Sequence, residues 1–485
     1  MHPNDIKGKK ATVVGGARSG LAVARLLARA GAKVFLTDKG EPTQGLVQAL
    51  GEAGVAYEFG GHTPRALDAD FFAVSPGVPS TVNIVQQALR SGLKVYSEIE
   101  VASWFCKAPI VAITGSNGKT TTTSLIGYLF RQAGRGTIVG GNIGYPFSDY
   151  VMDVKEDDVV VLEVSSFQLD HIDTFRPRVA VLLNITPDHL DRYGYDFNAY
   201  AQSKFRIFEN QRDDDVLVYN HDDELVREYV AWAAARRGLK TMGFSLETEL
   251  ENGAFVRDLA RGTRRPDEGR PDDAGPAATP GAETPGAAPL VVLRINQQEE
   301  ILMQADKLSL RGRHNLYNSL AAAVAARVME VRSDVVRESL MSFEGVPHRL
   351  EFVRELDGVR YINDSKATNV NAVWYALESF ASEKIVLIAG GRDKGNDYTS
   401  LKPILRRKAR ALIAIGESAD RVVEALGDTA PQTMEAASME EAIRCARLLA
   451  EPGDVVLLSP ACASFDMFDN YEDRGDTFKR LVMSL

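Results

Sequence analysis

Short apolar runs recur along this chain, and most are followed by a polar or glycine-rich turn and then by a stretch with helical spacing. Runs of this length and order predict buried parallel strands joined by helices, the pattern of an α/β fold. The predicted strands lie at 11–14, 33–37, 71–74, 111–113, 158–164, 179–184, 359–362, 384–389, 411–415 and 454–458. Turns at the carboxyl ends of parallel strands meet at one sheet edge, so we expect ligand sites there.

The grouping of these strands predicts three domains in a chain of 485 residues. We expect a Rossmann-like N-terminal domain over 1–107 and a P-loop ATPase-like central domain with a mostly parallel sheet over 108–346. A Rossmann-like, doubly wound C-terminal domain would follow over 347–485. Residues 257–290 are rich in Pro, Gly, Ala, Asp and Arg, which predicts a flexible insertion between strand-like segments of the central domain.

Composition narrows the class of protein. The net charge is −10 and no long basic run occurs, which argues against a nucleic-acid-binding surface. No apolar run reaches membrane-spanning length, and the first residues lack the features of a signal peptide. The three cysteines are far apart in sequence and match no zinc spacing. We therefore expect a cytoplasmic protein with reduced thiols. We also expect a monomer.

The stretch from Ile113 to Thr121, Ile-Thr-Gly-Ser-Asn-Gly-Lys-Thr-Thr, carries the clearest chemical signal. A glycine-rich turn between a buried strand and a helix points backbone N–H groups at one spot, where a polyphosphate binds. Lys119 would reach the outer phosphates and the Thr120 hydroxyl would ligate Mg²⁺. The common P-loop has a glycine where this chain has Ile113. The alternative is a plain strand–turn–helix.

A second glycine-rich turn, Gly15 to Gly20, opens the chain between a strand and a helix. Asp38 ends the next strand, 18 positions after Gly20, as in dinucleotide-binding units whose acid binds a ribose hydroxyl. The middle glycine of that motif is Ala17 here, so we favour another nucleotide over a nicotinamide cofactor. A nicotinamide dehydrogenase built on this unit remains the alternative from another enzyme class.

Polar side chains stand at the ends of strands in the central domain. Glu163 ends one apolar run, His189 follows another between two aspartates, and Asn142 lies in a Gly-Gly-Asn-Ile-Gly turn. A carboxylate there could hold Mg²⁺ or merely cap the next turn. A helix expected over 200–209 carries Lys204, whose spacing alone predicts a solvated or paired surface lysine.

Six motifs together resemble the Mur ligase family, three-domain ATP-dependent amide ligases of peptidoglycan precursor synthesis. The motifs, which span the chain apart from 257–290, are Thr114–Thr120, Glu163–Gln168, Asn184–His189, His314-Asn315-x-x-Asn318, His348-Arg349 and Asn363–Asn369. The stretches Ser459–Phe468, Arg474-Gly475 and Ser75–Gly77 most resemble the branch that adds D-glutamate to UDP-N-acetylmuramoyl-L-alanine.

This resemblance implies a mechanism in which ATP phosphorylates the muramoyl-alanine carboxylate to an acyl phosphate. The D-glutamate amine then attacks, and a tetrahedral intermediate collapses to the amide and phosphate. It also implies two Mg²⁺ sites. From the net charge, no nucleic acid is expected among the partners. The alternatives are another Mur-type ligase with a different amino-acid acceptor, folylpolyglutamate synthase and a non-catalytic nucleotide-binding regulator. The Ser459–Ser464 stretch and the first domain argue against a folate substrate.

The resemblance also implies roles for individual residues. Catalysis would rest on Lys119, Glu163, His189 and Lys204, and the metals on Thr120, Glu163, His189 and Lys204 in carbamylated form. ATP would contact Gly115, Ser116, Asn117, Gly118, Lys119, Thr120, Thr121, Asn315, Asn318, Arg349 and Asp364. The uridine nucleotide would contact Arg18, Ser19, Asp38 and Gly77, with Asn142 and His189 nearer the muramoyl-alanine end. D-Glutamate would contact Thr368, Lys394, Ser464 and Tyr471. Tyr471 stands where the family usually has phenylalanine, and Lys39-Gly40 where it has Thr-Arg.

Overall fold

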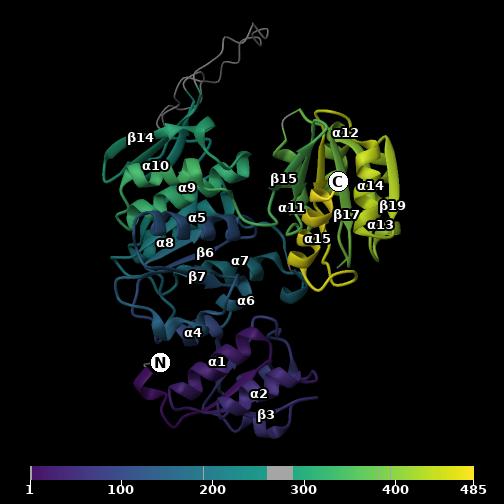
Figure 1. Cartoon of the computed structure of the whole chain (residues 1–485). Coiled ribbons are helices and arrows are strands. Elements are labelled where there is room, and N and C mark those ends of the chain that lie inside the picture. The colour runs from purple at the N-terminus through teal and green to yellow at the C-terminus, as the bar shows by residue number, and fades with distance from the viewer. Residues whose placement is uncertain (1–2, 189, 259–287, 381, 394) are drawn as a thin grey trace. The chain divides into compact units, whose positions relative to one another are not determined.

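The computed structural model describes residues 3–188, 190–258, 288–380, 382–393 and 395–485. The chain divides into two compact units (Figure 1). One consists of residues 1–308 and 316–343 and contains two β-sheets. The other consists of residues 309–315 and 344–485 and contains the third sheet.

The first sheet is wholly parallel, in the order β3-β2-β1-β4-β5. Its strands are β1 (Lys10–Val14), β2 (Lys33–Thr37), β3 (Ala56–Glu58), β4 (Phe71–Val74) and β5 (Lys94–Ser97). The associated helices are α1 (Arg18–Arg29), α2 (Gln44–Glu52), α3 (Asn83–Arg90) and α4 (Glu98–Ser103). Because β1 lies between β2 and β4, the turns after these three strands emerge side by side.

The second sheet has the order β14-β13-β12-β11-β10-β9-β6-β8-β7, parallel from β7 to β12 and antiparallel beyond. Its strands are β6 (Ile110–Thr114), β7 (Thr137–Gly141), β8 (Val159–Glu163), β9 (Val179–Leu182), β10 (Val216–Asn220), β11 (Lys240–Ser245), β12 (Gly253–Arg257), β13 (Leu290–Ile295) and β14 (Gln298–Gln304). The helices in this part are α5 (Lys119–Gln132), α6 (Ser166–Leu169), α7 (Phe197–Phe205), α8 (Glu224–Arg237), α9 (Arg313–Val328) and α10 (Ser333–Ser342).

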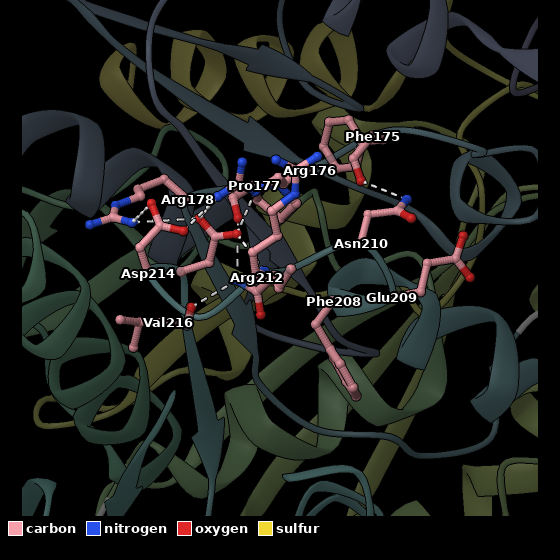
Figure 2. Close-up of polar contacts among 12 residues, drawn as sticks. Phe175, Arg176, Pro177, Arg178, Phe208, Glu209, Asn210, Arg212, Asp214 and Val216 are labelled. Atoms are coloured by element: carbon pink, nitrogen blue, oxygen red, sulfur yellow. Dashed lines mark hydrogen bonds and ion pairs between the residues drawn. The ribbon is translucent and has the colours of Figure 1, made fainter. Parts of the chain in front are cut away.

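An ion-pair cluster joins the segments that precede β9 and β10 (Figure 2). Arg176 contacts Asp214 and Asp215 over 2.7 and 2.6 Å, and Arg178 contacts Asp214 over 2.8 Å. The amide of Val216 also donates to Arg178 O. The cluster fixes the register of this strand pair at the end opposite to the turns that carry the predicted site, so its role is structural.

The third sheet has the order β15-β16-β20-β17-β18-β19, with only the β15–β16 pair antiparallel. Its strands are β15 (Glu351–Leu356), β16 (Val359–Asn363), β17 (Ile385–Gly390), β18 (Ala409–Ile415), β19 (Gln432–Ala436) and β20 (Val455–Leu458). The helices are α11 (Val370–Glu378), α12 (Lys402–Lys408), α13 (Ala419–Leu426), α14 (Met439–Leu449) and α15 (Tyr471–Met483). Separate apolar cores line the two faces of the sheet, as in a doubly wound fold.

The predicted α/β class with mostly parallel sheets is confirmed. The division at 107 and 346 remains a prediction. The predicted insertion begins later than expected, because Arg257 pairs with Leu290 in the β12–β13 ladder; residues 259–287 lie outside the described residues. Cys106, Cys445 and Cys462 are free thiols. Among the described residues, no helix combines the length and apolarity that a membrane span requires.

Candidate active site

The turn between β6 and α5 forms a glycine-dependent loop. Gly115 and Gly118 have φ values of 156° and 85°, which side-chain-bearing residues rarely adopt. A Cβ at Gly118 would also lie 2.3 Å from Asn318 Oδ1. Helix α5 begins at Lys119, so its free N–H groups face the loop, and Thr120 and Thr121 are buried in its first turn. The geometry is that of a phosphate-binding loop.

The segment after β9 holds this loop in place. Asn117 N donates to Asn184 Oδ1 over 2.8 Å, and Asn184 Nδ2 donates back to Asn117 O over 3.0 Å. Ser116 Oγ donates to Thr186 O over 2.8 Å and accepts from Thr186 N over 2.9 Å. Four hydrogen bonds between two loops leave little freedom to either, so the loop is positioned by its own sheet.

A polar cluster lies where β8 ends beside the first turn of α5. Thr120 Oγ1 donates to Glu163 Oε2 over 2.7 Å, and Asn142 Nδ2 donates to Glu163 Oε1 over 3.0 Å. The backbone N–H of Asn142 donates to Glu163 O over 2.8 Å. Glu163 is only 3 % exposed, and a buried carboxylate needs such partners. The three predicted residues are therefore brought together.

Lys204 lies inside the protein, which corrects the prediction from spacing of a surface lysine. Its Nζ donates to Gly115 O over 2.8 Å and lies 4.8 Å from the centre of the Tyr200 ring, and the residue is 2 % exposed. Helix α7 points this face inward because Tyr200, four residues earlier, packs in the core. The tyrosine hydroxyl also makes a hydrogen bond of 2.9 Å with Ser116 Oγ.

Two lysine side chains meet at one carbonyl. Lys119 Nζ donates to Gly115 O over 2.7 Å and to Ser116 O over 2.8 Å, and Gly115 O is also the acceptor for Lys204. Burial lowers the pKa of Lys204 well below its usual value, and repulsion from Lys119 lowers it further. Asp188, Glu163 and Asp170 oppose this shift without cancelling it. The Lys204 amine is thereby driven toward its neutral form.

The two predicted adenine-binding asparagines have different surroundings. Asn318 Oδ1 accepts from Thr122 Oγ1 over 3.2 Å, which places it against the phosphate loop. Asn315 Nδ2 donates to Arg311 O over 2.8 Å, within the other compact unit. Both residues belong to α9, which begins at Arg313.

A shallow cleft of about 430 Å³ lies beside the Gly15–Gly20 turn. Arg18 and Asp38 both line it, and Asp38 Oδ2 accepts from Gly16 N. Ser19 lies on the first turn of α1, next to Arg18. Gly77 belongs to the loop after β4, where Ser75 Oγ donates to Gly15 O over 3.0 Å. These two turns share one edge of the first sheet, as predicted.

In the second unit, Asp364 follows β16 and is almost fully buried. Burial raises the pKa of Asp364 to about 6, while Arg349 and hydrogen bonds from Ser459 Oγ and Leu350 N restrain the shift. The Ser459 hydrogen bond is 2.8 Å long. Arg349 is therefore close enough to Asp364, just after β16, to act on its charge. This proximity is compatible with the prediction that both residues contact the same nucleotide.

The loops that carry the predicted D-glutamate residues are joined by a buried guanidinium. Arg474 donates to Ser365 Oγ and Ser365 O over 2.9 and 2.8 Å, and to Cys462 O over 3.1 Å. Ser365 Oγ in turn donates to Tyr471 O over 2.8 Å. The arginine therefore ties the 363–369 turn, which carries Thr368, to the 459–464 turn, which carries buried Ser464.

Two predicted residues, His189 and Lys394, lie outside the described residues. Within the ranges that the structure describes, no group of three or more His, Cys, Asp and Glu side chains is arranged to hold a metal ion. Beside the phosphate loop, two oxygen donors converge: the Thr120 hydroxyl and the Glu163 carboxylate.

Several residues around the site were not predicted from the sequence. Thr186 contacts the phosphate loop, and Tyr200 contacts Lys204. Arg192 contacts the loop at Gly77. The sequence gives one indication for Tyr200: it precedes the candidate Lys204 by four residues, which places both on one face of a helix. Backbone-directed contacts such as those of Thr186 leave no trace in a single sequence.

Three family models match successive parts of the chain. They are the Mur ligase MurD-like N-terminal domain at residues 9–97, the Mur ligase middle domain at 113–326 and the Mur ligase glutamate ligase domain at 348–462. The order and the boundaries of these matches follow the three sheets.

Full-length relatives agree with the models. The chain is 61 % identical to a UDP-N-acetylmuramoylalanine–D-glutamate ligase of Salinibacter ruber and 47 % identical to one of Chloroherpeton thalassium, with 100 % of each chain covered. A solved MurF ligase of Thermotoga maritima in complex with ADP has a TM-score of 0.57 at 16 % identity, covering 100 % of this chain and 97 % of its own. That likeness concerns the fold alone. The chain belongs to the Mur ligase family.

Proposed function

We propose that this chain is an ATP-dependent ligase that joins D-glutamate to UDP-N-acetylmuramoyl-L-alanine, giving ADP and phosphate. The observation that carries the proposal is the 61 % identity, over both whole chains, to a relative with that name. The convergence of Lys119, Thr120, Glu163 and Lys204 at one loop supports the phosphoryl-transfer step. We also propose that the enzyme acts in the cytoplasm and as a monomer.

The first step forms a bond between the γ-phosphorus of ATP and an oxygen of the muramoyl-alanine carboxylate, and it breaks the bond to ADP. Catalysis of such a transfer is mostly alignment and charge neutralisation. The N–H groups at the start of α5 would hold the phosphates. Lys119, which donates to the carbonyls of Gly115 and Ser116, would exchange these acceptors for phosphate oxygens.

The donor set fits Mg²⁺, which prefers hard oxygen ligands. Thr120 and Glu163 would hold it, because their oxygens lie 2.7 Å apart in a buried site beside the phosphate loop. His189 and a carbamylated Lys204 are proposed for a second ion. When bound, such ions neutralise charge that builds up on the transferred phosphoryl group.

Lys204 has the properties needed for carbamylation. A neutral amine attacks CO₂, forms an N–C bond and loses a proton, which leaves an anionic carbamate. Because burial and the neighbouring Lys119 lower the pKa of Lys204, a larger share of its amine is neutral than for an exposed lysine. Its position between Gly115 O and the Tyr200 ring directs the nitrogen at the phosphate loop. The product would be a carboxylate-like ligand where the sequence has a lysine.

In the second step the D-glutamate amine attacks the acyl phosphate carbon, and the tetrahedral intermediate expels phosphate. We propose that Thr368, Lys394, Ser464 and Tyr471 hold D-glutamate. Arg349, Asp364, Asn315 and Asn318 would hold the adenosine part of ATP. Arg18, Ser19, Asp38 and Gly77 would hold the uridine nucleotide, with Asn142 and His189 at its muramoyl-alanine end. The shared cleft of Arg18 and Asp38 supports this assignment for the nucleotide.

A substrate-omission assay tests the proposal. Phosphate release should require ATP, UDP-N-acetylmuramoyl-L-alanine and D-glutamate together, and Lys119→Ala should abolish it. Release that is independent of D-glutamate would contradict ligation. A quench of NADH fluorescence on binding, without ATP turnover, would favour the nicotinamide alternative instead.

A further inference from the structure

Arg192 connects the two sheets of the first compact unit. It lies on the 3₁₀ helix Leu190–Tyr193, which follows the segment that clamps the phosphate loop. Its Nη1 donates to Pro76 O over 3.0 Å and its Nη2 to Gly77 O over 3.3 Å. The same guanidinium lies 4.1 Å from the centre of the Phe167 ring. One side chain thus contacts two segments far apart in sequence.

The loop that Arg192 holds packs against the Gly15–Gly20 turn, whose residues Gly16, Ala17 and Arg18 line the cleft. Ser75, next to Pro76, donates to Gly15 O, and the amide of Val78 donates to Ser75 O. A Cβ at Gly15 would lie 2.8 Å from Val78 Cγ2, so the loop packs tightly on the Gly15 turn. A shift of this loop would therefore disturb the turn that precedes Arg18.

The other end of this connection is anchored near Lys204. Tyr193, the neighbour of Arg192, donates to Asp170 Oδ2 over 2.9 Å and to Ser203 Oγ over 3.2 Å. Ser203 in turn donates to Ser166 O over 2.7 Å, which binds α7 to α6, the helix of Phe167. Arg192 consequently projects from a support fixed to the helices next to Glu163 and Lys204.

We propose that Arg192 is a positioning residue that sets the loop at Gly77 at the correct distance from the phosphate loop, and so governs binding of the nucleotide-linked acceptor. The proposal rests on the proposed function, since it assigns that acceptor to the cleft. The planar guanidinium donates to two adjacent carbonyls while it stacks on an aromatic ring, which a lysine ammonium cannot do. Lysine at this position therefore cannot replace arginine.

A second link between the same parts of the chain provides a matched control. Lys94 and Asp173 form an exposed ion pair of 3.7 Å, with side chains 67 % and 44 % exposed. Such a pair contributes little and holds no loop in one geometry. Lys94→Ala removes a cation from the same junction without touching the loop at Gly77.

The test measures two things: the affinity for UDP-N-acetylmuramoyl-L-alanine by calorimetry, and the KM values for ATP, UDP-N-acetylmuramoyl-L-alanine and D-glutamate by steady-state kinetics. It compares wild type with the variants Arg192→Lys, Arg192→Ala, Phe167→Leu and Lys94→Ala. We expect both Arg192 variants to weaken nucleotide binding about ten- to a hundredfold, the range for two hydrogen bonds from a charged donor. Phe167→Leu, which keeps apolar packing, should weaken it about threefold. The KM values for ATP and D-glutamate and the unfolding midpoint should stay unchanged, as should every parameter of Lys94→Ala.

Nucleotide binding by Arg192→Ala as tight as that of wild type would overturn the inference, as would a parallel rise of all three Michaelis constants. Full rescue by Arg192→Lys would also overturn it, because charge alone would then suffice. Absence of nucleotide binding by wild type would instead contradict the proposed function, and the inference with it. The calorimetric measurement separates these cases because it needs no turnover.

Discussion

The Thr120 hydroxyl donates a 2.7 Å hydrogen bond to Glu163, although the two residues belong to different strand–helix units of the central sheet. Strands β6 and β8 are parallel neighbours, so the turn after one lies beside the last residue of the other. This adjacency places a hydroxyl and a carboxylate together at the start of α5, where the helix supplies N–H donors to a phosphate.

Glu163→Gln should lower kcat by about a hundred- to a thousandfold, the usual effect of removing a charge that stabilises a transition state. The amide retains the shape of the side chain, so the unfolding midpoint should stay close to that of wild type. The measurement is phosphate release as a function of Mg²⁺ concentration. Glu156→Gln, at an exposed position before the same strand, is the control. A variant with unchanged Mg²⁺ dependence would exclude Glu163 from the metal site.

Lys204→Ala should lose activity by about a hundredfold or more, as expected for removal of a metal ligand, and excess bicarbonate should not restore it. In CO₂-depleted buffer, wild type should lose activity and regain it when bicarbonate is added. Protonation of the amine opposes the carbamate, so this loss should deepen as pH falls. Lys240→Ala at an exposed site is the control. Near-normal turnover of Lys204→Ala would refute the carbamate ligand.

Asp364 should make ATP binding sensitive to pH. Its pKa is raised to about 6 by burial, so lowering pH through that value protonates the acceptor proposed for the ribose. KM for ATP should rise about tenfold between pH 7 and 5 in wild type. Asp364→Asn should have a higher KM for ATP that changes less with pH. Because ATP itself titrates, the effect of Asp364 is taken from the ratio of the KM values of variant and wild type at each pH. Parallel profiles would contradict this role.

The same shift has a consequence for stability. Since the pKa of Asp364 is higher in the folded chain than in the unfolded one, ionisation opposes folding. The stability of the protein without nucleotide should therefore fall as pH rises toward about 6. Asp364→Asn should remove this component, which is measured by chemical unfolding at a series of pH values. An unchanged pH slope in the variant would contradict the burial argument.

Deletion of residues 265–286 should leave kcat and KM within about twofold of wild type, since the segment lacks apolar residues that could anchor it. The flanking strands end at the paired residues Arg257 and Leu290, so a short turn can rejoin them. Steady-state kinetics of the deletion variant provides the measurement. A tenfold loss would mean that this segment takes part in binding or catalysis.

Much of the fold follows from the sequence because buried parallel strands leave apolar runs with a polar residue at the carboxyl end. Glu163 was identified in this way, whereas Asp364 was implied by the resemblance to the family. Strands β3 and β19 are among those that were missed, since their burial patterns are largely exposed or mixed at a sheet edge and their sequences are not continuously apolar.

The burial of Lys204 does not follow from the sequence. Helical spacing describes which residues share a face, but not whether a charged residue on that face has a buried acceptor such as Gly115 O. The same holds for Arg192, whose acceptors are backbone carbonyls of another sheet's loop. Contacts to backbone atoms do not depend on side-chain identity, so neither partner is recognisable from the sequence.

The most direct test of the central claim is the choice of amino acid. Phosphate release and product mass should be measured with ATP, UDP-N-acetylmuramoyl-L-alanine and, in turn, D-glutamate, L-glutamate, L-alanine, L-lysine and diaminopimelate. Turnover is expected with D-glutamate and with none of the other four amino acids, and the product should be heavier by one glutamyl residue. Turnover with another amino acid in its place would contradict the proposed acceptor and would leave the chain a Mur ligase of different specificity.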